Sequence, residues 1–213
     1  MAKNFSTLLR SYLRGVLDPL GRALVRAGVT ANAVTIVGAV GVCIGSIGFL
    51  ARGEILAALI VVTLFAFTDM LDGAIARAQG GSGSRFGMFL DSTTDRLSDG
   101  VIVGSLAYWF AVSEQRVAFV GALVCLVAGQ LVSYAKARAE GVGVRCDVGI
   151  AERSERLVLL GLGALGYVIG VPYAFEVALW LVAVLSVITV GQRVAHVRRA
   201  IAQADRPTSR GMA

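Results

Sequence analysis

Two neighbouring segments of the chain read ILAALIVVTLFAFTDMLDGAIARA (residues 55–78) and FGMFLDSTTDRLSDGVIVGSLAYWFAV (residues 86–112). Each is long enough to cross a membrane as a helix, for which about 20 mostly apolar residues are needed. Yet together they carry a group of carboxylates: Asp69, Asp72, Asp91, Asp95 and Asp99. One Asp at the centre of a membrane helix costs about 2.5–3.5 kcal/mol. Such a group therefore indicates a functional site in which something compensates the charges.

The composition of the whole chain is that of a membrane protein. Of its 213 residues, 56% are hydrophobic and 16% are charged, whereas soluble domains are about half apolar and about a quarter charged. These values exclude an ordinary soluble protein, a disordered chain and a coiled coil. Six apolar segments predict an all-α fold with six transmembrane helices, at residues 33–51, 55–78, 86–112, 117–134, 157–171 and 174–190.

The positions of Lys and Arg predict the orientation of these helices. With six spans, all of the 20 basic residues except Arg52 and Arg116 fall on one side. Because cytoplasmic loops of membrane proteins are enriched in Lys and Arg, both termini and the aspartates are expected to face the cytoplasm. The chain is thus expected to be one cell-membrane domain over residues 1–213, with a six-helix bundle at 33–200 and a flexible tail at 201–213.

The N-terminal segment, residues 5–27, predicts an amphipathic helix on the membrane surface. Its leucines recur at helical spacing, and Arg10 and Arg14 lie on another side of the helix. A helix of this kind lies in the interface with its apolar face toward the lipid. Packing of the same face on the protein's own cytoplasmic side is an alternative that the sequence leaves open.

The aspartate spacings predict a site for divalent cations. Asp69 and Asp72 are three residues apart, and Asp91 and Asp95 are four apart, so each pair shares one face of its helix. The short connection between the two helices makes them antiparallel neighbours. Four converging carboxylates repel one another unless cations neutralise them. Ligands that offer only oxygen favour Mg²⁺, with Mn²⁺ as a second choice, and four carboxylates suffice for two ions.

Structural ion pairs are the alternative interpretation of these acids. Arg77, Arg85 and Arg96 lie close to them in sequence and are possible partners. Four acids at these spacings favour a metal site over this alternative. Asp99 lies one turn beyond Asp95, and the sequence leaves its role open.

The stretch from Asp69 to Asp95 resembles the signature of the CDP-alcohol phosphotransferase family. The pattern is D, two residues, DG, two residues, AR, a loop, G, three residues, D, three residues, D, and every fixed position matches, including Gly87. The resemblance implies transfer of a phosphatidyl group from CDP-diacylglycerol to an alcohol with release of CMP. It implies that Asp69, Asp72, Asp91 and Asp95 bind metal and that Asp95 is also the general base.

The resemblance also implies which residues contact the CDP-lipid. These residues come from the segment before the first span, where Ala31 replaces the family's usual proline, and from the signature itself: Asn32, Ala33, Val34, Thr35, Gly73, Arg77 and Ser84.

A second set of basic residues bears on the acceptor. Lys136 and Arg138 end the fourth predicted span, and the fifth and sixth spans have further cations at their cytoplasmic ends. Positive-inside anchoring explains some of them, but together they indicate an anionic acceptor. The surrounding sequence resembles the family's phosphatidylinositol phosphate synthases, which implies inositol 1-phosphate, with these acceptor-phosphate contacts: Ser133, Lys136, Arg153, Arg156 and Arg193. Glycerol 3-phosphate, the acceptor of a phosphatidylglycerophosphate synthase, is the main rival.

Two other function classes remain as hypotheses. A divalent-cation transporter would use the aspartates as a pathway, although the chain shows no internal repeat. A non-catalytic scaffold would be expected to lack one of the metal-binding aspartates. The expected partners are membrane lipid, CDP-diacylglycerol and a phosphorylated polyol, with no nucleic acid. Relatives of this kind are usually homodimers, so the resemblance implies a dimer. The acyl-chain preference, the number of resting metal ions and the role of His196 stay open.

Overall fold

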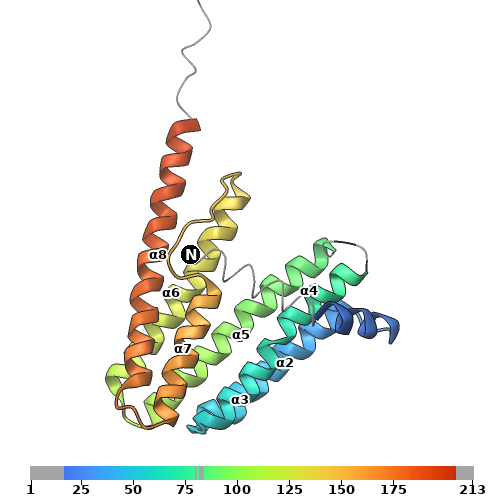
Figure 1. Cartoon of the computed structure of the whole chain (residues 1–213). Helices are drawn as coiled ribbons and strands as arrows, with labels where there is room; N and C mark the ends of the chain where they lie inside the picture. The colour runs from blue at the N-terminus through green and yellow to red at the C-terminus, as the bar shows by residue number, and fades with distance from the viewer. Residues whose placement is uncertain (1–16, 80, 82–83, 205–213) are drawn as a thin grey trace, which may run out of the picture. The chain divides into compact units, whose positions relative to one another are not determined.

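The computed structural model describes residues 17–79, 81 and 84–204, and helices are the only regular secondary structure in this part of the chain (Figure 1). A helical segment at residues 17–26 comes first. It is followed by α2 (Ala31–Gly48), the short 3-10 helix η1 (Leu50–Arg52), α3 (Ile55–Ala66), α4 (Thr68–Ala78), α5 (Arg85–Val112), α6 (Arg116–Gly141), α7 (Arg153–Val168) and α8 (Ala174–Ala204). The predicted all-α fold is confirmed.

The chain divides into two compact units, Met1–Ile102 and Val103–Ala213, with the boundary inside α5. In the first unit, α2 packs closely against α3 and α4. Glycines on α2 make this approach possible, because a Cβ at Gly38 would overlap the Thr68 side chain and a Cβ at Gly41 would overlap the Phe65 ring. Small residues of this kind let membrane helices come close together.

The predicted span at residues 55–78 is interrupted at Phe67, where α3 ends and α4 begins. The hydroxyl of Thr68 donates to the carbonyl of Phe65 at 2.5 Å, a local bond that competes with regular helical bonding. The interruption places Asp69 in the first turn of α4. The positive end of the helix dipole stabilises a carboxylate at this position.

In the second unit, α8 packs against both α6 and α7. An aromatic cluster fills the end of this unit: Trp109 meets Tyr167 edge to face with 5.6 Å between ring centroids, and Phe110 meets Phe175 at 6.1 Å. Edge-to-face pairs at such distances are favourable beyond the area that they bury.

Four helical stretches are long and apolar enough to cross a membrane: Ala31–Arg52, Ile55–Ala78, Arg116–Gly141 and Ala174–Ala204. The predicted third and fifth spans do form helices, α5 and α7, but spanning by these two stays a prediction. Helix α5 carries Asp91, Asp95 and Arg96 in its first half and Asp99 at its middle. Helix α7 has 16 residues, about 24 Å at 1.5 Å per residue, against a hydrocarbon core of about 30 Å.

The structure describes part of each predicted terminal segment. Residues 17–26 pack on α4, since a Cβ at Gly21 would lie 2.9 Å from the carbonyl carbon of Ala74. The rest of the predicted surface helix, residues 5–16, lies outside the described residues. At the other end, α8 continues to Ala204. The predicted tail therefore begins with four helical residues, and residues 205–213 lie outside the described part.

Candidate active site

A pocket of about 280 Å³ lies in the first unit, where residues from the start of α2, from α4 and from the start of α5 meet. It contains the predicted metal ligands Asp72 and Asp91. It also contains four of the predicted CDP-lipid contacts. The residues that line it are Thr30, Ala31, Asn32, Thr35, Asp72, Gly73, Ala76, Gln79, Ser84, Gly87, Met88 and Asp91. The structure therefore joins the segment before the first span to the aspartate motif.

Thr35 holds Asp72 in place at this pocket. Its Oγ1 lies 2.6 Å from Asp72 Oδ2 and 3.1 Å from the carbonyl oxygen of Ala31. Thr35 is buried on α2, whose start is fixed by Thr30: the Thr30 hydroxyl accepts a hydrogen bond from the Ala33 N–H at 3.2 Å. A side chain that orients a carboxylate in this way is typical of the surroundings of metal ligands.

The carboxylates of Asp69 and Asp91 lie close enough to Asp72 for their negative charges to act on it. This mutual repulsion is what a bound divalent cation relieves, and the all-oxygen donor set fits Mg²⁺ or Mn²⁺. Among the described residues, no three His, Cys, Asp or Glu side chains stand in the arrangement of a metal cage. Binding an ion would therefore require these carboxylates to turn toward it.

Asp95, the predicted base, does not line the pocket. Its side chain is 17% exposed and lies 3.5 Å from Arg96 Nη2. It lies one helical turn beyond Asp91 on α5, so the two carboxylates share a helix face. The alternative of structural ion pairs therefore fits Asp95 with Arg96, whereas Arg77 pairs with Asp18 and not with an aspartate of the motif.

The predicted CDP-lipid contacts fall into two groups. Asn32, Thr35, Gly73 and Ser84 line the pocket, whereas Ala33, Val34 and Arg77 do not. Arg77 instead forms an ion pair at 2.9 Å with Asp18 of the N-terminal helical segment, and both side chains are partly exposed. Its Nη1 would lie 3.5 Å from a Cβ on Gly73, so its guanidinium is close to the edge of the pocket.

Gly87 leaves room where the start of α5 lines the pocket. A Cβ there would lie 3.1 Å from Asn32 Oδ1 and 3.2 Å from Ser84 Oγ. Ser84 Oγ accepts a hydrogen bond from the Gly87 N–H at 2.9 Å, which is how a serine caps the start of a helix. The fixed glycine of the motif therefore leaves room beside two polar side chains.

The sequence analysis missed Thr30, Gln79 and Met88 as lining residues. For Thr30 the signal was present, because a Thr before an apolar helical run is a common N-cap. Gln79 and Met88 flank the glycine-rich connection, whose course the sequence pattern does not specify.

An apolar groove of about 480 Å³ also lies in the first unit. It runs along one face of α2 and reaches Thr94 and Leu97 of α5, which flank Asp95 in sequence. Its other lining residues come from α2: Ile36, Ala39, Val40, Cys43, Ile44, Ile47 and Gly48.

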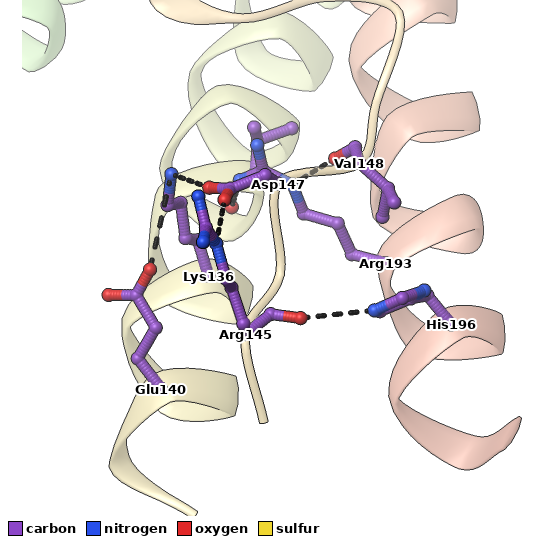
Figure 2. A network of polar contacts seen from close by, with 8 residues as sticks. Lys136, Glu140, Arg145, Asp147, Val148, Arg193 and His196 are labelled. Atoms are coloured by element: carbon purple, nitrogen blue, oxygen red, sulfur yellow. Dashed lines mark hydrogen bonds and ion pairs between the residues drawn. The ribbon is translucent and has the colours of Figure 1, made fainter. Parts of the chain in front are cut away.

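The predicted acceptor contacts belong to the second unit. Ser133 and Lys136 lie one turn apart on α6, and Arg153 and Arg156 lie in the first turn of α7. Lys136 Nζ lies 2.7 Å from Asp147 Oδ1, and Arg145 Nε lies 2.5 Å from Asp147 Oδ2 (Figure 2). Asp147 and Arg145 come from the connection between α6 and α7, and the sequence analysis did not identify them.

Two of these arginines also fasten the protein's own backbone. The buried Arg193 of α8 donates from Nε to the carbonyl of Val148 at 2.9 Å and from Nη1 to the carbonyl of Val132. The buried Arg156 donates from Nη1 to the carbonyl of Ala151 at 3.4 Å. A guanidinium has five N–H donors, so these bonds are compatible with a further anionic ligand.

The hydrogen bonds from Lys136 and Arg145 lower the pKa of Asp147 to about 2. Asp147 is therefore ionised at neutral pH. His196 of α8 adds a contact in the same region, with Nε2 at 3.0 Å from the carbonyl oxygen of Arg145 (Figure 2).

Known proteins are similar to this chain in both sequence and fold. The chain is 44% identical over 209 residues to a phosphatidylinositol phosphate synthase of Streptomyces avermitilis, covering 94% of this chain and 85% of that protein. It is 47% identical over 190 residues to the Mycobacterium marinum protein of the same name, covering 87% and 81%.

Solved structures of Mycobacterium tuberculosis phosphatidylinositol phosphate synthase are similar throughout. The structure with CDP-DAG bound matches with a TM-score of 0.82 at 40% identity, covering 93% of this chain and 98% of that one. The complex with manganese and citrate matches with a TM-score of 0.81, covering 92% and 93%. The sequence model of one family, the CDP-alcohol phosphatidyltransferases, matches residues 28–191. With this family model matched over most of the chain and relatives that are 44% and 47% identical, the chain belongs to the CDP-alcohol phosphatidyltransferase family.

Proposed function

We propose that this membrane enzyme transfers the phosphatidyl group of CDP-diacylglycerol to inositol 1-phosphate, forming phosphatidylinositol phosphate and CMP. The observation that carries the proposal is the pocket of the first unit, which Asp72 and Asp91 line together with Asn32 and Ser84. The relatives, at 44% and 47% identity over most of the chain, carry the name of that activity. Family membership supports an enzyme over the transporter and scaffold hypotheses.

In this proposal, the pocket holds the cytidine diphosphate. Asn32 and Ser84 offer hydrogen-bonding side chains, and Gly73 and Gly87 leave space for the ligand. Thr35 keeps Asp72 oriented at 2.6 Å, and Arg77 supplies a positive charge near the pyrophosphate. Ala33 and Val34 would contribute only through the backbone at the start of α2. The apolar groove along α2 would accept an acyl chain, since its wall continues to residues adjacent to Asp95.

Asp69, Asp72, Asp91 and Asp95 would hold one or two Mg²⁺ ions, or Mn²⁺. Bound cations would neutralise the pyrophosphate and the charge that develops on the departing CMP. The hydroxyl oxygen of the acceptor would bond to the phosphatidyl phosphorus while the bond from that phosphorus to CMP breaks. Asp95 would accept the proton that this hydroxyl loses. A carboxylate near cations is a weak base, so its main contribution would be to orient the hydroxyl.

The cations of the second unit would bind the acceptor's phosphate. Ser133 and Lys136 project from one stretch of α6, and Arg153 and Arg156 from the first turn of α7. Arg193 would add charge while it fastens the backbone of Val148 and Val132. Paired Lys and Arg side chains recognise phosphate through charge-assisted hydrogen bonds. We further propose that both termini and the site face the cytoplasm and that the enzyme is a homodimer.

An acceptor panel tests the proposal. Purified full-length protein with CDP-diacylglycerol and Mg²⁺ would be given inositol 1-phosphate, glycerol 3-phosphate, inositol or serine. We expect lipid product with inositol 1-phosphate and little with the other three acceptors. Efficient turnover of glycerol 3-phosphate would instead identify a phosphatidylglycerophosphate synthase. Turnover of a neutral acceptor alone would contradict the role of the second cation group.

A further inference from the structure

A carboxylate that the proposed activity does not use lies between two cations of the second unit. Oδ1 of Asp147 forms an ion pair with Lys136 Nζ at 2.7 Å, and Oδ2 forms one with Arg145 Nε at 2.5 Å. Glu140, one turn along α6, reaches the same ammonium only at 4.0 Å. Asp147 is therefore the carboxylate that sets the direction of the Lys136 side chain.

The connection that bears Asp147 is fastened on both sides of this residue (Figure 2). Before it, the carbonyl of Arg145 contacts His196 at 3.0 Å. After it, the carbonyl of Val148 accepts from Arg193 at 2.9 Å, and the N–H of Ala151 donates to Thr189 Oγ1 at 3.1 Å. His196, Arg193 and Thr189 all belong to α8. The backbone around Asp147 is thus held by one helix while its side chain holds a lysine of another.

Holding a lysine has a direct consequence for a ligand that the lysine binds. A Lys side chain is a flexible four-carbon stem that loses rotamer entropy when it is fixed. If the side chain is already oriented, a ligand does not bear that cost when it binds. The ammonium has three N–H donors, so contact with Asp147 is compatible with contact to a phosphate. Arg145 on the second oxygen reduces the repulsion that Asp147 would exert on that phosphate.

We propose that Asp147 is a positioning residue that presents the Lys136 ammonium to the phosphate of the acceptor. This inference rests on the proposed function, in which Lys136 binds that phosphate. Asp147 itself touches neither substrate. Its effect should therefore appear in the KM of the acceptor and should vanish when Lys136 is absent.

The test is steady-state kinetics of the full-length enzyme with inositol 1-phosphate and CDP-diacylglycerol varied in turn. We expect Asp147→Asn to raise the acceptor KM about threefold to tenfold, as for the loss of one immobilised side chain. The KM for CDP-diacylglycerol and kcat should change less than about twofold, because no contact of Asp147 is catalytic. Glu140→Gln is the matched control. It also removes one negative charge near the Lys136 ammonium, but Glu140 lies 4.0 Å from that ammonium and not at hydrogen-bond distance. This variant should leave the acceptor KM unchanged.

A double-mutant cycle separates positioning from a general structural effect. Adding Asp147→Asn to Lys136→Ala should raise the acceptor KM no further, because the side chain through which Asp147 acts is gone. Asp147→Glu, which keeps a carboxylate on a longer stem, should restore part of the wild-type KM. Three results would each overturn the inference. In the first, the increases in acceptor KM of the two single variants multiply in the double variant. In the others, Asp147→Asn raises both KM values equally or lowers the acceptor KM.

Failure of the inference and failure of the proposed function give different results. A wild-type enzyme that uses inositol 1-phosphate while Asp147→Asn matches it refutes only the role of Asp147. If the wild type uses glycerol 3-phosphate instead, the same cycle applies with that acceptor. A wild type that turns over neither phosphorylated acceptor refutes the proposed function, and the role of Asp147 with it.

Discussion

At the scale of single residues, the chemistry depends on carboxylates whose surroundings hold them in place. Thr35 lies 2.6 Å from Asp72, and the charges of Asp69 and Asp91 act on the same carboxylate. The spacing of these aspartates, and their membership of one motif, could be predicted from the sequence. The bond from Thr35 could not, because it depends on how closely α2 approaches α4.

Thr35→Val tests this bond. The variant keeps the size of the side chain and removes the hydroxyl that orients Asp72, so we expect about a tenfold lower affinity for the activating divalent ion. The Mg²⁺ dependence of CMP release measures it. Thr93→Val is the control, because the Thr93 hydroxyl donates to the carbonyl of Phe89 within its own helix. Equal effects of the two substitutions would refute the role of Thr35.

Arg77 and Asp18 allow a second test at this scale. Both Arg77→Ala and Asp18→Asn break the same 2.9 Å ion pair, which is partly exposed and is expected to stabilise the fold by at most about 1 kcal/mol. If Arg77 contacts the pyrophosphate, Arg77→Ala should raise the KM for CDP-diacylglycerol about tenfold or more, as for a lost charge-assisted hydrogen bond. Asp18→Asn should not. An equal rise in both variants would show that only the ion pair matters.

At the scale of elements, the apolar segments predicted where helices lie but not where they end. Helix α6 continues beyond the predicted end at residue 134 to Gly141, and α8 continues from residue 190 to Ala204. The apolar pattern marks the part of a helix that suits lipid, and strong helix formers such as Ala, Lys, Arg and Glu extend it. Helix α7 begins at Arg153, earlier than predicted, because Glu152 and Glu155 form a capping box.

The interruption at Phe67 and the network around Asp147 could not be predicted. Both depend on hydrogen bonds between side chains and backbone carbonyls or amides in irregular segments, such as Thr68 with Phe65 and Thr189 with Ala151. Hydrophobic periodicity contains no information about such bonds. The cations on α6, α7 and α8 were visible in the sequence, whereas the hydrogen bonds from Arg193 to the carbonyl of Val148 and from Arg156 to the carbonyl of Ala151 were not.

The close packing of α2 on α3 and α4 gives a prediction about stability. A Cβ at Gly38 would overlap Thr68, so Gly38→Ala should force the helices apart and lower the free energy of unfolding by about 1–3 kcal/mol. Gly48→Ala is the control, because no atom lies within 4 Å of a Cβ at that position in the same helix. Thermal unfolding in detergent compares the two. A Gly38→Ala variant as stable as Gly48→Ala would contradict the close approach.

At the scale of the whole molecule, an apolar helical protein carries two polar groups of opposite charge, one in each compact unit. Carboxylates line the pocket of the first unit, and cations gather on α6, α7 and α8 in the second. A lipid-linked nucleotide and a phosphorylated alcohol are the substrates that such a pair of groups would suit. The central claim is that the aspartates, with divalent cations, promote transfer of the phosphatidyl group from the lipid-linked nucleotide to the phosphorylated alcohol.

Acceptor-dependent release of CMP tests that claim most directly. Purified enzyme with CDP-diacylglycerol should release CMP only when both Mg²⁺ and inositol 1-phosphate are present, with one phosphatidylinositol phosphate formed for each CMP. Removal of Mg²⁺ by EDTA should stop the reaction, and Asp95→Asn should abolish it while CDP-diacylglycerol still binds. CMP release that persists in EDTA, or wild-type turnover by Asp95→Asn, would contradict the account.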